Sequence, residues 1–413
     1  MKIALLTTRL FEAPHSGGEI CTSRLMQTLR DAGHEVVCVG RGSNANDFNK
    51  TLSLDPAAVV SFDELSAIRK ALVLVGAIAR GQASTVQRLN AGGVALRARQ
   101  ALAALSAGPA DPPDVLVVDH LQTYAWVADA GADIPPVVLV MHNLEAQGYA
   151  ERARRLPERG VASKFRRGML QREATHLLAL ETLALRRAAA IACLSEDDAE
   201  YFRHRVAACG SDAPVVVLPG YPLCPPLTTV HVGPTGTGRR VGMIGTWTWG
   251  PNRDALRWML ERVVPLWHDC TLVLAGGGLD GLLLPERVVS LGRIDEVSSF
   301  YDAVDVLAVP SLHGSGVQEK AIEAIGSGRT VVATRHAMRG LAPGLPRQVH
   351  EADEPGPFAR LCVESLTAPS VARRDDVLQW SGRRRAAYGA AVDRCIAAAV
   401  YGLSRDRAAV QAT

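Results

Sequence analysis

The first 42 residues carry the pattern that most constrains the fold. The apolar run 3–7 predicts a strand, residues up to about 32 have helical spacing, and residues 35–39 predict a second strand. Gly33 stands where the end of such a helix needs a left-handed residue. Because Val36, Val37 and Val39 are all apolar, we expect this strand to be covered on both faces in a parallel sheet. This βαβ unit indicates an α/β protein.

The same alternation continues along the chain and predicts two sheets in tandem. Further strands are expected at 115–118, 137–141, 191–194, 240–244, 271–275, 288–291, 306–309 and 330–333, and residues 145–190 have a mostly helical pattern. A segment rich in proline and glycine, residues 219–240, is typical of a linker. Because ligands bind outside the C-terminal ends of parallel strands, two such domains facing each other would form one cleft.

Charge, hydropathy and cysteine content exclude several classes of protein. The 413 residues hold 45 Lys and Arg against 42 Asp and Glu, so a nucleic-acid partner is not expected. The apolar runs are far shorter than the roughly 20 residues that cross a bilayer, and the N-terminus lacks the features of a secretory signal. We therefore expect a cytoplasmic protein. The eight cysteines include no C-x-x-C pair, which predicts neither a zinc site nor a disulfide framework.

The sharpest motif runs from His313 to Ala324, after a strand and into a helix. A glycine-rich turn before a helix directs backbone N–H groups and the positive end of the dipole at an anion, commonly a phosphate. Lys320 and Glu323 lie three residues apart on one helix face. A solvated ion pair after a plain turn explains the local spacing equally well.

Three further motifs carry weaker signals. Residues 276–281 match G-x-G-x-x-G, but the helix that a dinucleotide site needs is interrupted by Pro285, which favours a turn. Gly17 and Gly18 follow the first strand and would let a ligand approach the backbone, or simply form a turn. His142 stands at a strand end, where α/β folds place their chemistry, although a lone histidine is usually structural.

Residues 151–173 hold eight basic residues against three acidic ones. Such a patch could rest on anionic lipid at the inner face of a membrane. A solvated helix face and an anionic acceptor are the other two interpretations. The sequence has no P-loop, G-x-S-x-G, H-E-x-x-H or D-x-D motif, which disfavours kinase-like, hydrolase, metalloprotease and manganese-dependent chemistry.

The order of these motifs resembles the retaining glycosyltransferases of family 4. The resemblance runs from residue 1 to about 390 and rests on Gly17-Gly18, MHNLE at 141–145, LSEDD at 194–198, IGTWTWGPNRDAL at 244–256, LAGGG at 274–278, LGRIDEV at 291–297 and GSGVQEKAIEAIGSGRTVVAT at 314–334. It implies the GT-B fold, which consists of two Rossmann-like domains. Residues 1–220 would bind the acceptor, residues 221–380 the nucleotide sugar, and residues 381–413 would form a helix that returns to the first domain.

The resemblance also implies roles for individual residues. His142, Lys320 and Glu323 would be the catalytic residues, with Lys320 at the donor diphosphate and Glu323 at the ribose. The remaining donor-binding residues would be Gly18, Gly245, Thr246, Arg253, Ile294, Ser315, Gly316 and Val317. Gly17, Glu19 and Asn143 would contact the acceptor. No metal and no cofactor beyond the donor sugar nucleotide is implied.

The chain departs from the family pattern at two places. Ser315 stands where the family often has a glutamate that holds the sugar. The loop after Gly245 lacks the usual arginine and lysine, so Arg253 is a candidate substitute, and its Pro251-Asn252 pair resembles a branch often linked to surface polysaccharide assembly. Two alternatives stay open: a nucleotide-dependent oxidoreductase or epimerase that uses the Gly276 loop, and a GT-B scaffold without activity.

Overall fold

The computed structural model divides the chain into two compact units. Unit 1 comprises Met1–Leu218 and Gly389–Thr413, and unit 2 comprises Pro219–Tyr388. The structure describes residues 1–11, 14, 16–40, 66, 68, 72–73, 75–77, 83–90, 93–107, 111–130, 134–157, 159–223, 239–279, 283–314, 316–341, 343–366 and 374–411, with side chains in the last helix at 375–401. Most of the predicted linker therefore lies outside the described residues.

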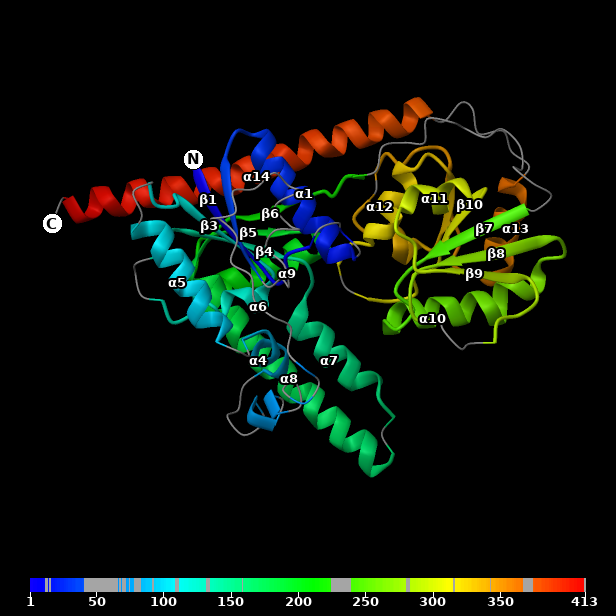
Figure 1. Cartoon of the computed structure of the whole chain (residues 1–413), viewed down its shortest axis with the longest axis horizontal. Helices are drawn as coiled ribbons and strands as arrows, with labels where there is room; N and C mark the ends of the chain where they lie inside the picture. Colours follow the sequence, from blue (N-terminus) through cyan, green and yellow to red (C-terminus); the bar gives the residue numbers. More distant parts are fainter. Residues whose placement is uncertain are drawn as a thin grey trace. The chain divides into compact units, whose positions relative to one another are not determined.

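Unit 1 is a parallel six-stranded sheet in the order β2-β1-β3-β4-β5-β6, with helices packed against it (Figure 1). The strands are β1 (Lys2–Thr7), β2 (Glu35–Gly40), β3 (Val115–Asp119), β4 (Val137–Met141), β5 (Ala188–Cys193) and β6 (Val215–Val217). The helices are α1 (Gly17–Asp31), α4 (Ser84–Asn90), α5 (Val94–Ala107), α6 (Leu121–Tyr124), α7 (Glu145–Arg155), α8 (Val161–Arg187) and α9 (Glu196–Ala208). The strands are buried throughout their centres, as expected of a sheet covered on both faces.

Unit 2 repeats this architecture with strand order β12-β11-β10-β7-β8-β9. Its strands are β7 (Arg239–Ile244), β8 (Cys270–Ala275), β9 (Val288–Gly292), β10 (Val306–Val309), β11 (Thr330–Ala333) and β12 (Val349–Glu351). Its helices are α10 (Gly250–Trp258), which continues as a π turn (Met259–Val263) and a 3-10 turn (Val264–Leu266), then α11 (Val297–Asp302), α12 (Glu319–Gly326), a 3-10 turn (Arg335–Met338) and α13 (Pro355–Ser365). The expected pair of α/β sheets is confirmed.

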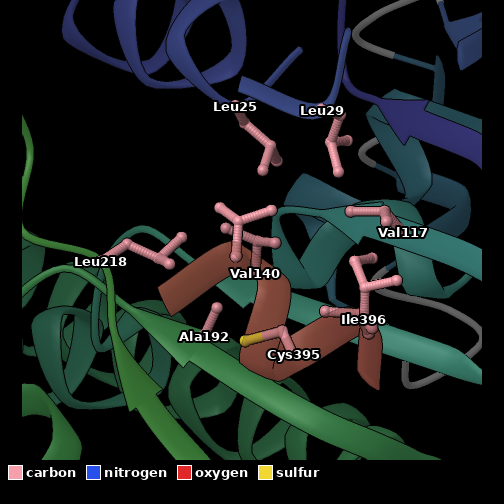
Figure 2. Close-up of a pocket in the computed structure, with 10 residues that line it drawn as sticks. Leu25, Leu29, Val117, Val140, Ala192, Leu218, Cys395 and Ile396 are labelled. Atoms are coloured by element: carbon pink, nitrogen blue, oxygen red, sulfur yellow. The ribbon is translucent and has the colours of Figure 1, made fainter. Parts of the chain in front are cut away.

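The final helix α14 (Arg374–Gln411) contributes to both units, because its residues from Gly389 onward pack with unit 1. Figure 2 shows Cys395 and Ile396 of α14 facing Leu25 and Leu29 of α1 across a small apolar pocket. Val140 of the sheet also lines this pocket. Apolar side chains therefore pack this part of α14 against unit 1. Of the helices in the described part of the chain, none combines the length and apolar character needed to cross a bilayer.

The strands predicted from the sequence agree with the structure except in three places: the start of β5 and the short strands β6 and β12. The helix ends also follow local signals. Gly33 has φ +79°, as expected at a helix C-terminus, and the Ser195 side chain accepts from the Asp198 N–H at 3.1 Å as the N-cap of α9. Residues 145–190 are mostly helical, as predicted, but β5 begins at Ala188 instead of residue 191 and pairs with β4. Pairing in the sheet here overrides the helix propensity of alanine. β6 and β12 were not predicted because each is three residues long.

In each sheet the first strand lies between two strands that the chain reaches on opposite sides of it. This arrangement creates a topological switch point. In unit 1 β1 pairs with β2 on one side and β3 on the other. In unit 2 β7 pairs with β8 on one side and β10 on the other. Loops that follow neighbouring strands at a switch point diverge and leave a crevice outside the carboxyl ends. The residues that follow β1, β3, β7 and β10 are therefore the ones positioned to meet ligands.

The glycine-rich loop after β8 is a close-packed turn. Gly276 has φ +111°, and a Cβ there would overlap the carbonyl oxygen of Gly245. The Trp247 N–H donates to the Gly277 carbonyl at 3.0 Å, which joins this loop to the one after β7. The described residues 283–287 contain no helix before β9. The motif therefore lacks the helix of a dinucleotide fingerprint, as its interrupting proline indicated.

We expect Gly276→Ala to lower the free energy of unfolding of unit 2 by about 3 kcal/mol, because the added methyl group clashes with backbone in a conformation unfavourable for alanine. Gly277→Ala is the matched control, since a Cβ there has nothing within 4 Å. Urea unfolding of both variants measures the effect. Equal stabilities would contradict the close approach of the two loops.

Candidate functional site

The switch point of unit 1 holds a buried hydrogen-bonded cluster around Asp119, the last residue of β3. The Asp119 Oδ1 lies 2.5 Å from Nε2 of His142, which follows β4. The other carboxylate oxygen accepts from the Thr22 hydroxyl at 2.5 Å and from the Thr7 hydroxyl at 3.2 Å. Thr7 ends β1 and Thr22 lies in α1, so four elements converge on one carboxylate.

The electrostatics of this cluster favour an ionised Asp119. Burial alone would raise the pKa of its carboxyl group, but the adjacent His142 and His120 and the hydrogen bonds from His142 and Thr22 outweigh burial and hold the pKa below its ordinary value. Because a carboxylate only accepts hydrogen bonds, the contact with Asp119 places a hydrogen on Nε2 of His142. Asp119 thereby fixes both the orientation and the tautomer of His142. The His142 Nδ1 is buried and has no hydrogen-bond partner among the described residues.

His120 is the more exposed of the two histidines and packs against His142, with ring centroids 3.7 Å apart and the ring planes tilted by 42°. Its φ of +75° is unusual for a residue other than glycine. Burial and the neighbouring His142 lower its pKa to about 4, so the ring is neutral at physiological pH. A Cβ at Gly18 would lie 3.5 Å from this ring, which places Gly18 beside His120.

The three residues predicted to contact the acceptor are Gly17, Glu19 and Asn143, and each lies close along the chain to Gly18 or His142. Gly17 begins α1, whose N-cap Ser16 accepts from the Glu19 N–H at 3.3 Å. The half-buried Glu19 carboxylate lies 4.0 Å from the Arg9 guanidinium. Asn143 is half-buried and directly follows His142. The structure thus places all three in unit 1, close along the chain to Gly18 or His142.

The switch point of unit 2 joins the helices after β7 and β10 through one hydrogen bond. Lys320 Nζ in α12 donates to Asn252 Oδ1 in α10 at 2.6 Å. The Asn252 amide in turn donates to the Thr246 carbonyl at 3.0 Å and packs against Gly245. Burial lowers the pKa of Lys320 to about 8. Among the residues that the structure describes, Lys320 forms no ion pair, so no carboxylate balances the charge of its ammonium group.

The turn into α12 is held by its own backbone and by Arg339. Gly316 has φ +74°, and the Arg339 guanidinium donates to the carbonyls of Gly314, at 3.0 Å, and of Gly316. The preceding residue, Gln318, gives the helix no side-chain cap. The first N–H groups of α12 therefore lie beside Lys320 without a capping oxygen from Gln318. The Glu323 carboxylate, one turn further on, accepts from the Leu223 N–H at 3.0 Å.

The other predicted donor residues divide into three groups. Thr246 and Arg253 are exposed, and Arg253 donates to the Thr248 carbonyl at 3.0 Å. Ile294 and Val317 are half-buried and pack on the same apolar cluster of unit 2. Ser315 lies outside the described residues. The structure therefore brings Gly245, Thr246 and Lys320 together through Asn252, while Arg253 faces its own loop.

Five residues of these clusters were not predicted as site residues: Thr7, Thr22, Asp119, His120 and Asn252. Asp119 and His120 gave a signal, because polar residues directly after a buried strand mark the ligand edge of a parallel sheet. The Pro251-Asn252 pair stood out in the sequence, but nothing indicated its contact with Lys320, which joins residues 68 apart in the chain.

Asp119, His120 and His142 also match a metal-binding set, because each offers one ligand atom within 4.8 Å of the others. The hydrogen bonds of Asp119 weigh against that use. Both of its oxygens already accept hydrogen bonds from His142, Thr7 and Thr22. A metal would have to displace these donors, so the cluster fits a histidine-orienting role better than a cation site.

The lowered pKa of His120 predicts a loss of stability in acid. The folded state disfavours the protonated ring. The contribution of neutral His120 to the free energy of unfolding is therefore fully present above the unfolded pKa of about 6.5, and it is lost as the pH falls towards 4. For this partly exposed ring we expect about 2 kcal/mol. Urea unfolding at pH 7 and pH 4 should show a smaller pH effect in His120→Asn, which tolerates the left-handed backbone. The same reduction in the control His204→Asn, on exposed helix surface, would contradict this assignment.

Two family models match the chain. Residues 16–221 match the glycosyl transferase 4-like domain, and residues 238–367 match the glycosyl transferases group 1. Comparison with curated proteins finds no match.

Solved structures show the same fold at low sequence identity. Anabaena HepE in complex with UDP-glucose has a TM-score of 0.57 at 15% identity, covering 98% of this chain and 100% of its own. The α,α-trehalose 6-phosphate synthase of Burkholderia multivorans has a TM-score of 0.57 at 13% identity, covering 99% and 98%. S. aureus TarM, as a variant in complex with fondaparinux, α-GlcNAc-glycerol and UDP, has a TM-score of 0.56 at 10% identity, covering 96% and 98%. With its GT-B fold and both family domains in order, this chain belongs to the family 4-like glycosyltransferases.

Proposed function

We propose that this glycosyltransferase moves a sugar from a nucleoside-diphosphate sugar to a hydroxyl acceptor, with retention of configuration and without a metal ion. Unit 2 would bind the donor and unit 1 the acceptor. The observation that carries the proposal is the half-buried Lys320 at the switch point of unit 2, held by Asn252 beside the start of α12. Similar structures support it, since HepE is in complex with UDP-glucose and TarM with UDP and α-GlcNAc-glycerol.

A diphosphate suits the Lys320 site for electrostatic reasons. A partly buried ammonium whose pKa is lowered to about 8 gains more from an anion than an exposed one, because the anion offsets the cost of burying its charge. The positive end of α12 adds to this attraction. Glu323 accepts from a backbone N–H and, like any carboxylate, has room for further donors, which fits a ribose hydroxyl.

Bond changes in the proposed transfer balance without a protein nucleophile. The acceptor oxygen bonds to the anomeric carbon on the face from which the diphosphate departs, and the carbon–oxygen bond to the diphosphate breaks. The acceptor proton passes to the departing phosphate oxygen. Lys320 and the start of α12 would stabilise the negative charge that grows on that phosphate. No metal is needed for this stabilisation because fixed positive groups supply it.

The histidine pair would position ligands in unit 1. Asp119 holds His142, and His142 supports the more exposed His120 beside Gly18. We propose that His142 orients the reacting groups and is not a classical base, and that His120 makes the outer contact. If His142→Ala retained full turnover, this role would be excluded.

Lys320→Met tests the donor site through nucleotide binding. We expect its affinity for one of UDP, GDP, ADP or TDP to fall at least tenfold, which corresponds to about 1.4 kcal/mol. Its free energy of unfolding should stay equal or rise by about 1 kcal/mol, because burial of the lysine charge is removed. Calorimetric titration with and without EDTA measures the binding, and NMR of the product sugar gives its configuration.

Lys164→Met is the matched control, since Lys164 is exposed in unit 1. Stabilisation by NADH alone would favour the oxidoreductase alternative, and no binding of any nucleotide would favour a scaffold. Loss of nucleotide affinity in EDTA, or an inverted product, would contradict the corresponding part of the proposal.

A further inference from the structure

The helical hairpin of α7 and α8 extends from the sheet of unit 1 (Figure 1). All buried residues of α8 lie from Glu173 onward, so its first twelve residues, Val161–Arg172, include none. The start of α8 is tied to the end of α7, because the Arg167 guanidinium donates to the Leu156 carbonyl at 2.7 Å. The start of α8 is thus exposed and joined to α7.

Two large apolar side chains are exposed at this end. Val161 is 86% exposed and Phe165 is 71% exposed. They are four residues apart at the start of α8, so they share one face of the helix. Exposed phenylalanine without a packing role is costly in water and marks an interaction surface when charged residues surround it.

Five basic side chains accompany them: Arg154, Arg155, Arg159, Lys164 and Arg166. We name these five residues with Val161 and Phe165 the hairpin tip. All seven are exposed, and none of the five basic residues forms an ion pair with a residue that the structure describes. Residues 152–167 have a net charge of +6, whereas the whole chain has +3, so the remainder is net acidic. The positive charge is concentrated at one place.

The position of these charges is unfavourable for the helix alone. The first turn of α8 contains no acidic residue, and its N-cap Gly160 supplies no side-chain hydrogen bond. Lys164 and Arg166 instead lie near the positive end of the helix dipole, where cations are disfavoured. An anion at the hairpin tip would relieve this repulsion and satisfy the uncapped helix start.

We propose that the hairpin tip docks on an anionic membrane surface, with Val161 and Phe165 inserted among the lipids and the basic side chains at the phosphates. A bilayer interface offers both chemistries at once, and stable attachment needs both an apolar and a basic contribution. Docking itself does not depend on the proposed function. Its consequence does rest on that function, because an acceptor held in a membrane would be brought to unit 1.

Vesicle co-sedimentation of the full chain tests this docking. We expect binding to vesicles of equal phosphatidylcholine and phosphatidylglycerol, and little binding to phosphatidylcholine alone. Val161→Ser with Phe165→Ser should weaken binding at least tenfold. Replacement of the five basic residues by glutamine should abolish it, because each basic residue near an anionic surface is worth roughly a fivefold change in affinity. All seven side chains are exposed, so both variants should fold.

Matched controls come from exposed residues elsewhere. Leu283→Ser, and glutamine at Arg262, Arg335, Arg347, Arg360 and Arg394, should leave vesicle binding within twofold of wild type. Equal losses in these controls would show nonspecific adsorption and overturn the proposal. The proposal would also be overturned if the wild-type protein did not bind anionic vesicles, whether or not it bound an oligonucleotide.

Nucleotide binding by the hairpin variants separates this proposal from the proposed function. The variants should bind the nucleoside diphosphate like wild type while losing the vesicles. If instead wild type binds vesicles but no nucleotide, docking stands and the donor proposal fails.

Discussion

Parallel pairing around the first strand of each unit is the constraint on which both sites depend. The chain connects β1, and likewise β7, to strands on both of its sides. The loops that follow these neighbouring strands therefore diverge and leave a crevice between them. Polar groups can lie there without interrupting a strand. Asp119 with His142 occupies this position in unit 1, and Asn252 with Lys320 occupies it in unit 2. The same arrangement thus places a carboxylate–histidine pair in one unit and an amide–lysine pair in the other.

The two clusters differ in how their charges are compensated. Asp119 is fully buried, yet hydrogen bonds from His142, Thr7 and Thr22 stabilise its ionised form. Among the described residues, Lys320 has a neutral hydrogen-bond partner in Asn252 and no ion-pair partner, so its charge is poorly compensated there. Native proteins keep such locally unfavourable groups mainly where they serve function. A compensated cluster suits positioning, whereas an uncompensated cation suits the capture of an anion.

Strand positions and the glycine-rich turn into α12 could be predicted because their causes are local. Runs such as 137–141 and 306–309 are apolar on both faces, and the structure has strands with these same bounds. Contacts between distant elements could not be predicted in this way. Nothing near Asn252 in the sequence indicates Lys320, and the support of His120 by His142 follows from the order β3-β4 in the sheet. β6 and β12 escaped prediction because three residues carry no periodicity.

The most direct test of the donor site is the pKa of Lys320, measured by NMR of the labelled lysine side chain with and without the nucleoside diphosphate that binds. The chain has five lysines, so assignment through Lys320→Arg is practical. We expect a pKa of about 8 in the free protein and a clear rise once the diphosphate is bound. An ordinary pKa near 10.4 in the free protein, or a value that the bound nucleotide leaves unchanged, would contradict the claim that Lys320 is an uncompensated cation that awaits the donor phosphates.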